Sequence, residues 1–245
     1  MIELLHQIEQ IDTQIFLFFN GFHNVYWDYF MMIFSDRFVW VPFYASFIFV
    51  LLKNFPVKVV MSTIVVITLI ILFSDQTASG ILKPLVARMR PSNPDNPISP
   101  MVHVVQGYRG GRYGFPSSHA ANAWSMAFFA QYLVRRSKLT IFLCLWALIT
   151  SYSRMYLGVH YFGDILIGTL IGFLYATLYY YIFQYFLRKH TERFKPNHDI
   201  RFASVPIITG LVSIWVIICT SGILSFYSIP VSYTHLRAHE TRGNL

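Results

Sequence analysis

The sequence predicts an all-α fold, a polytopic membrane helical bundle of about six transmembrane helices with an N-terminal amphipathic or interfacial helix. The composition is the first observation behind this prediction. The 245 residues have a mean hydropathy of +0.49, with 55% hydrophobic and only 12% charged residues, which is too apolar for a soluble domain. The second observation is a series of apolar runs, each near the roughly 20 residues that one helical span requires. They lie near residues 38–53, 57–78, 119–135, 139–156, 162–187 and 204–228.

The runs and their connections fill most of the chain, so residues 1–230 are interpreted as a single membrane-embedded domain with a core at 57–187. Residues 11–34 are apolar enough to form a further helix, which either spans the membrane or lies tilted at its interface. From residue 231 the pattern changes abruptly to mixed polar residues, VSYTHLRAHETRGNL. Residues 231–245 are therefore expected to be a non-native tail, and they carry no functional prediction.

The basic residues in the connections predict how the bundle is oriented. Lysine and arginine next to spans are retained on the cytoplasmic side. The connections after the first, third and fifth runs carry such residues and are assigned to that side: Lys53, Lys58, Arg135, Arg136, Lys138, Arg188, Lys189, Arg193, Lys195 and Arg201. The long connection from about 83 to 117 and the short one from about 157 to 162 then share the opposite, exported face.

The exported connections are also basic, against the simple rule. Either the orientation is reversed, or these cations have a function, because charges at membrane depth are costly and are candidates for functional sites. We adopt the second interpretation because the cations gather on one face beside polar and glycine-rich backbone. They are Lys83, Arg88, Arg90, Arg109, Arg112 and Arg154.

The first candidate motif is KPLVARMRP, Lys83 to Pro91. Its two outer cations, Lys83 and Arg90, are seven residues apart, so two helical turns would bring them to one face, as an anion site requires. Pro84 suits a first helical turn and Pro91 ends the segment. A plain basic flank of a membrane helix is the alternative interpretation.

The second candidate motif is FPSSHA, Phe115 to Ala120. A proline followed by Ser117 and Ser118 is typical of a helix N-terminus, where a serine caps the first turn and free N–H groups favour an anion. His119 would lie at that positive end and could donate a proton. Taken alone, the motif is also explained by a helix cap with an incidental histidine.

The third candidate motif is SRMYLGVHYFGD, Ser153 to Asp164. Arg154 is suited by geometry to bidentate binding of phosphate. His160 and Asp164 are four residues apart, so the carboxylate can hold one ring nitrogen while the other stays available as a nucleophile. Two glycines in the segment argue against one continuous helix, so this contact is expected across a turn. The alternative is a structural histidine–aspartate pair at a helix end.

The predicted topology places all three motifs on the same membrane face, and together they indicate phosphoryl transfer. Lys83, Arg90 and Arg154 would neutralise the phosphoryl oxygens, one histidine would attack phosphorus, and the other would protonate the departing oxygen. The sequence has no acidic cluster suited to magnesium or zinc, so neither a metal nor any other cofactor is expected.

These residues resemble the type 2 phosphatidic acid phosphatases, a family that shares its core with the vanadium haloperoxidases. The family signature reads K-x6-RP, then PSGH, then SR-x5-H-x3-D. This chain matches its spacing over Lys83–Pro91, Pro116–His119 and Ser153–Asp164, within a resemblance that covers about residues 57–187. The departure is Ser118, which stands where the signature has glycine; activity is expected to survive because its backbone N–H can still face phosphate.

The resemblance implies a role for each matching residue. His160 would form a phosphohistidine, Asp164 would orient it, and His119 would protonate the leaving group. The phosphate-binding residues would be Lys83, Arg90, Ser117, Ser118 and Arg154.

The resemblance also implies a multi-pass enzyme of the bacterial inner (cytoplasmic) membrane, with its site facing the periplasm or exterior. Its expected partners are a lipid phosphate and membrane lipids, not nucleic acid, and the oligomeric state is left open. Undecaprenyl diphosphate is the favoured substrate, with phosphatidylglycerophosphate, phosphatidic acid and lipid A as alternatives. A lipid phosphotransferase and a non-enzymatic lipid transporter are the competing functions. Arg109 and Arg112 either contact a second phosphate or are solvated in a flexible loop.

Overall fold

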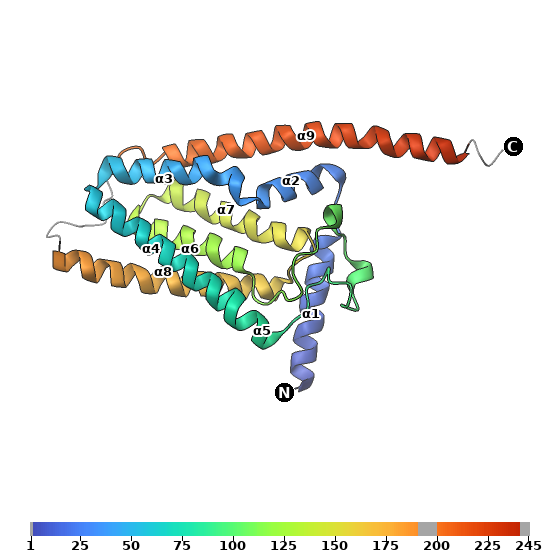
Figure 1. The fold of residues 1–245 in the computed structure, drawn as a ribbon, viewed down its shortest axis with the longest axis horizontal. Helices are drawn as coiled ribbons and strands as arrows, with labels where there is room; N and C mark the ends of the chain where they lie inside the picture. Colours follow the sequence, from blue (N-terminus) through green and yellow to red (C-terminus); the bar gives the residue numbers. More distant parts are fainter. Residues whose placement is uncertain (1, 191–199, 241–245) are drawn as a thin grey trace.

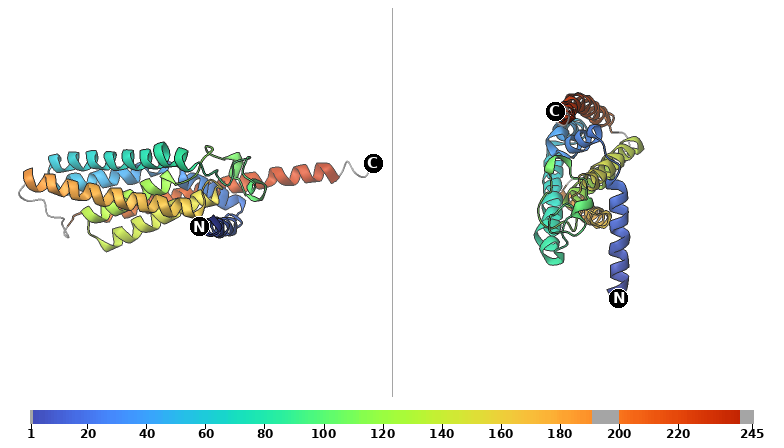
Figure 2. Two further views of the ribbon diagram at one scale, coloured as in Figure 1. Left: turned by 90° about the horizontal axis from the view of Figure 1, so that it is seen from below. Right: turned by 90° about the vertical axis from the view of Figure 1, so that its right-hand side faces the viewer.

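The computed structural model describes residues 2–190 and 200–240, which are largely helical (Figure 1). The helices of the bundle run side by side, and α6 packs against α4, α7 and α8 (Figures 1 and 2). These bundle helices are α3 (Val41–Asn54), α4 (Val57–Asp75), α6 (Ser118–Leu133), α7 (Ser137–Tyr156) and α8 (Phe162–His190). The predicted all-α membrane bundle is therefore confirmed.

Further helices surround the bundle. α1 (Ile2–Asn20) lies across one end, nearly at right angles to the bundle axis (Figures 1 and 2). α2 (Val25–Ser35) leads through a short 3₁₀ helix, η1 (Arg37–Trp40), into α3, and α9 (Val205–Glu240) packs along α2 and α3. The assignment of residues 231–245 as non-native stays a prediction.

The number of spans is lower than the six expected from the sequence. Among the described residues, four helical segments are long and apolar enough to cross a membrane, and α2 with η1–α3 would add a fifth span bent by 64°. The helix expected at 119–135 is only the 16-residue α6, whose small side chains are largely enclosed by its neighbours. The four segments are Val57–Val86, Ser137–Tyr156, Phe162–Leu187 and Val205–Ser228.

The segment 11–34, which the sequence predicted as one further spanning or interfacial helix, is divided between two helices. α1 ends at Asn20, and α2 begins after Asn24, whose side chain caps it by accepting a hydrogen bond of 2.9 Å from the Trp27 N–H. Asp36 caps the following turn, accepting at 2.8 Å from the Phe38 N–H. These polar caps explain why the chain turns twice before it enters α3.

Close packing of α8 on α6 holds the second and third motifs of the predicted site together. A side chain at Gly168 or Gly172 would bring its Cβ within 2.4 Å or 2.5 Å of carbonyl oxygens of α6 and its N-cap. Small residues allow such a close approach between membrane helices. The Ser117 N–H also donates to the Asp164 carbonyl at 2.9 Å, which fixes the start of α6 beside the start of α8.

Candidate active site

The three motifs meet at the end of the bundle that α1 crosses (Figure 1). There α4 continues through a π-helical turn, η2 (Gln76–Leu82), into the short helix α5 (Lys83–Val86). The connection from α5 to α6 contains two 3₁₀ turns, η3 (Ser99–Met101) and η4 (Val105–Gly107), and covers this end. The α3–α4 and α6–α7 connections, which carry predicted cytoplasmic residues, lie at the opposite end (Figure 1). Arg193 and Lys195, which were assigned to the same side, lie outside the described residues.

His160 and Asp164 form a buried pair across the turn between α7 and α8. His160 Nδ1 lies 3.3 Å from Asp164 Oδ2, and both side chains are almost completely buried. The helix break comes from Gly158, which adopts a φ of +74° that favours glycine, before α8 begins at Phe162. Because the carboxylate accepts from Nδ1–H, the lone pair of His160 lies on Nε2.

Arg90 approaches that lone pair from an extended segment, whereas the sequence predicted a helix. The helical geometry expected over Lys83–Arg90 is wrong, because α5 ends at Val86 and Ala87 takes a left-handed conformation with φ of 50°. The chain then runs extended, and Met89 pairs with Tyr113 in an isolated β-bridge. From this extended segment Arg90 Nη1 reaches His160 Nε2 at 3.1 Å and the Val159 carbonyl at 3.0 Å.

Arg154, in the last turn of α7, is the most buried of the site cations, with 3% exposure. Its Nη1 donates to the Ser35 hydroxyl and its Nη2 to the Tyr108 hydroxyl at 3.1 Å. The Tyr108 ring also lies 5.6 Å from the guanidinium carbon. The side chain is therefore fixed from α2 on one side and from the α5–α6 connection on the other.

The electrostatics favour an anion beside His160. Burial lowers the pKa of His160 well below its usual value, and the positive charges of Arg90, Arg154 and Lys83 lower it further. Burial and the charge of Arg154 also lower the pKa of Arg90. Within the described ranges, none of these cations forms an ion pair with a carboxylate, and Nε of both arginines is buried without a hydrogen-bond partner. A bound phosphoryl group would supply the missing negative charge.

The start of α6 supplies the remaining predicted residues. Ser117 caps the helix as expected, its hydroxyl accepting from the Ala120 N–H at 3.3 Å. Lys83 Nζ donates to the hydroxyls of Ser79 at 3.0 Å and Ser118 at 3.4 Å. The side chain that departs from the family signature therefore binds a signature lysine.

Two residues that hold the pair in place, Arg88 and Asp12, are absent from the predicted catalytic and phosphate-binding residues. Arg88 Nη1 donates to Asp12 Oδ2 at 2.7 Å and to Asp164 Oδ1 at 3.2 Å, and its guanidinium lies over the Tyr161 ring at 3.8 Å. Asp12 also accepts from the Gly163 N–H at 2.8 Å. Arg88 lies inside the first motif, which is a usable signal, whereas Asp12 is one of three carboxylates in α1, with Glu3 and Glu9, and nothing in the sequence distinguishes it from them.

Arg109 and Arg112, the two arginines of the α5–α6 connection, contact the connection itself. Arg109 Nη1 donates to the Ser92 carbonyl and, at 3.1 Å, to the Ser99 hydroxyl. Arg112 is exposed and lies 5.7 Å from the centre of the Tyr113 ring. These contacts give Arg109 a role in holding the loop together. Over residues 2–190 and 200–240, no group of three or more His, Cys, Asp or Glu side chains is arranged to hold a metal ion.

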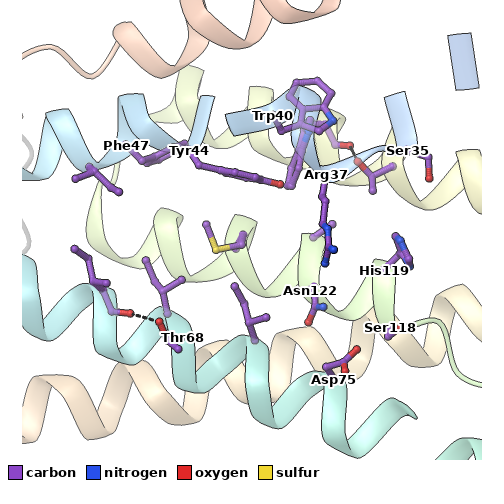
Figure 3. A pocket seen from close by; sticks show the side chains of 18 of the residues that line it. Ser35, Arg37, Trp40, Tyr44, Phe47, Thr68, Asp75, Ser118, His119 and Asn122 are labelled. Atoms are coloured by element: carbon purple, nitrogen blue, oxygen red, sulfur yellow. Dashed lines mark hydrogen bonds between the residues drawn. The ribbon is translucent and has the colours of Figure 1, made fainter. Parts of the chain in front are cut away.

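A groove of about 530 Å³ leads from the site along the bundle (Figure 3). Ser118 and His119 lie at one end, and mostly apolar side chains of α3, α4, α6 and α7 line the rest. The arrangement thus joins a cationic, histidine-containing centre to an apolar space between membrane helices. Such a site can carry out phosphoryl transfer on an amphiphile whose tails lie between the helices.

Comparisons with known proteins agree with this chemistry. Residues 59–188 match the model of the PAP2 superfamily, and the chain belongs to this family. It is therefore a membrane lipid phosphatase of the PAP2 type. It is 45% identical over 232 residues to the lipid A 4′-phosphatase of Bacteroides thetaiotaomicron, covering 92% of this chain and 100% of that protein.

More distant relatives share parts of the chain. The lipid A 4′-phosphatase of Porphyromonas gingivalis is 33% identical over 182 residues, covering 74% of this chain and 76% of that protein. The crystal structure of Aquifex aeolicus LpxE superposes with a TM-score of 0.53 at 22% identity, covering 69% of this chain and 94% of that chain, which shows a common fold.

Replacing Ser118 with glycine, the residue of the family signature, is expected to change kcat/KM by no more than about fivefold. Lys83 would lose one weak acceptor but keep Ser79 at 3.0 Å, and a single hydrogen bond contributes about 1 kcal/mol. Phosphate release from a lipid phosphate by the purified variant measures this. A loss of about 100-fold would show that the Ser118 hydroxyl is essential to the site.

Proposed function

We propose that this protein is a lipid A phosphatase that hydrolyses the 4′-phosphate. One observation carries the choice of substrate: the 45% identity to the Bacteroides lipid A 4′-phosphatase extends over the full length of that protein. Lipid A was an alternative from the sequence, where undecaprenyl diphosphate was favoured. The motifs are shared by phosphatases of many lipids, so they indicate the reaction but not the substrate. The full-length similarity favours a sugar phosphate monoester over a diphosphate as the substrate.

The first chemical step is attack by His160 Nε2 on phosphorus. The N–P bond forms as the bond from phosphorus to the sugar oxygen breaks, and His119 gives its proton to that oxygen. Lys83, Arg90 and Arg154 bind the phosphoryl oxygens, with further donors from Ser117, Ser118 and the free N–H groups at the start of α6. Support for His160 as nucleophile comes from Asp164 at Nδ1, which leaves the lone pair of the ring on Nε2.

The second step releases phosphate. A water molecule gives a proton to His119, its oxygen attacks phosphorus, and the N–P bond breaks, so that His160 and inorganic phosphate are regenerated. If a lipid hydroxyl replaced water, the same intermediate would make the protein a phosphotransferase.

The site is proposed to face the periplasm from the inner membrane. The charge distribution supports this orientation: the connections at the opposite end of the bundle carry Lys53, Lys58 and Arg135, which suit the cytoplasmic side. The apolar outward surfaces of α8 and α9 support contact with lipid, as Leu170, Phe173 and Trp215 illustrate with 50%, 41% and 65% exposure.

A substrate comparison tests the proposed function. Protein purified in detergent is given lipid A, undecaprenyl diphosphate and phosphatidic acid, each with and without EDTA, and phosphate release is measured. The expected result is the highest kcat/KM on lipid A, loss of the 4′-phosphate by mass spectrometry, and no effect of EDTA. Preferred hydrolysis of undecaprenyl diphosphate would show that the protein is a phosphatase of that lipid instead. Transfer of phosphate from a labelled substrate to an added acceptor lipid would show that it is a phosphotransferase.

A further inference from the structure

The groove beside His119 contains polar residues that the phosphoryl-transfer chemistry does not use. Most of its lining is apolar, but Arg37 from η1, Asp75 from the end of α4 and Asn122 from α6 gather at the end nearest His119 (Figure 3). All three line the same cavity of about 530 Å³. They come from three elements separated in sequence, so the fold has brought them together.

The hydrogen-bonding capacity of these three side chains is largely unused. Asn122 Oδ1 is buried and has no hydrogen-bond partner among the described residues. Within the same part of the chain, the Arg37 guanidinium makes no hydrogen bond or ion pair and only lies 5.1 Å from the Phe38 ring. Asp75 accepts one long hydrogen bond, of 3.4 Å from Ser79 to Oδ1. A buried polar atom left without a partner is costly, which indicates a ligand that supplies one.

Several other polar groups of the groove already have partners within the protein. Thr68 donates to the Ile64 carbonyl at 3.0 Å and Thr150 to the Trp146 carbonyl at 2.8 Å, each within its own helix. The Ser35 hydroxyl accepts from Arg154. Trp146 Nε1, which also lines the groove, is a further buried donor without a partner in the described part of the chain. Arg37, Asp75 and Asn122 differ from it in lying together near His119.

The position of the three residues relates them to the leaving group. Asn122 follows His119 by three residues on α6, so the two side chains lie on the same side of that helix. On the other side, Ser79 accepts from the phosphate-binding Lys83 at 3.0 Å and donates to Asp75 at 3.4 Å, which links the two sites. A group bonded to the oxygen that His119 protonates would thus lie against Asn122 and Asp75.

The chemistry of the three side chains selects the kind of leaving group. A guanidinium donates hydrogen bonds, a carboxylate accepts them and an amide does both, so together they fit a neutral group rich in hydroxyls and amides. A phosphate leaving group would bring negative charge close to Asp75, and a diacylglycerol offers no donor to Asp75 or Asn122 apart from the oxygen that His119 protonates.

We propose that Arg37, Asp75 and Asn122 form a headgroup site that binds the hydroxyl and amide groups of an acylated amino sugar, the leaving group of the reaction. This inference rests on the proposed function. Acyl chains of that sugar would continue into the apolar remainder of the groove. The site thereby selects phosphorylated sugar lipids over glycerol-based and polyprenyl phosphates.

The test compares substrates rather than absolute rates. Asn122→Leu, Asp75→Leu and Arg37→Gln are purified, and kcat/KM is measured on lipid A and on phosphatidic acid. For each variant the expected loss on lipid A is roughly 10-fold to 100-fold, because a sugar group loses its hydrogen-bond partner. The loss on phosphatidic acid is expected to be at least about fivefold smaller. Ser62→Ala, an exposed position on the same helix as Asp75, is the matched control and should change neither value.

Three outcomes are distinguished. An equal loss on both substrates, or no loss on lipid A, overturns the headgroup site while leaving the proposed function intact. A wild-type protein that releases phosphate from phosphatidic acid but not from lipid A overturns the proposed function and this inference with it. Arg37→Gln keeps the test decisive if the buried leucine variants fail to fold, because Arg37 is exposed at the rim of the groove.

Discussion

Replacing His160 with alanine is expected to lower kcat/KM on lipid A by about 10⁴-fold or more, because the variant has no nucleophile to form the N–P bond. The remaining cations would still bind the substrate, so the loss is expected in kcat, with little change in KM. Phosphate release by the purified variant measures it. In the wild type, rapid denaturation during turnover of ³²P-labelled substrate should trap acid-labile label on a peptide that contains His160.

His6→Ala is the matched control for this experiment, because His6 lies on the exposed part of α1 and outside the site. It should retain wild-type activity. If His160→Ala retained a tenth of the wild-type rate, or if the label were found on another residue, His160 could not be the nucleophile.

Replacing Asp164 with asparagine is expected to reduce kcat by roughly 10²-fold to 10⁴-fold, with His160 still present. The carboxylate accepts from His160 Nδ1–H at 3.3 Å and from the Tyr161 N–H at 2.9 Å, so it fixes both the tautomer and the position of the ring. An amide would have to present its oxygen to both donors, and it would remove the negative charge that stabilises a phosphohistidine. It would also leave Arg88 with a weaker partner than the ion pair at 3.2 Å.

Thermal unfolding separates the catalytic effect of Asp164→Asn from loss of the fold. The variant is expected to unfold cooperatively at a lower temperature, because a buried carboxylate–guanidinium contact is lost, but to remain folded at the assay temperature. Asp95→Asn, at an exposed position of the α5–α6 connection, is the matched control and should change neither measurement. A folded Asp164→Asn protein with normal kcat would rule out a role for Asp164 in orienting His160.

The sequence predicted the helical bundle, although with more spans than the described residues contain, and it predicted the types of residue that meet at the site. Apolar runs of span length reflect the bilayer directly, so helices and their approximate limits follow from composition. The Ser117 cap and the short reach from His160 to Asp164 are local, because each involves residues three or four positions apart. Local rules failed over Lys83–Arg90, where the left-handed Ala87 and the bridge from Met89 to Tyr113 replaced the expected helix.

The tertiary structure alone decided which distant residues support that site. Asp12 contacts Gly163 across 151 positions and Arg88 across 76, and no periodicity in the sequence encodes such pairs. The groove residues Arg37, Asp75 and Asn122 likewise come from separate helices. Membrane helices pack through non-local contacts between small residues, such as Gly168 against the start of α6, so their neighbours become known only when the bundle is assembled. The sequence by itself determined the reaction, whereas the assembled bundle decided what surrounds the leaving group.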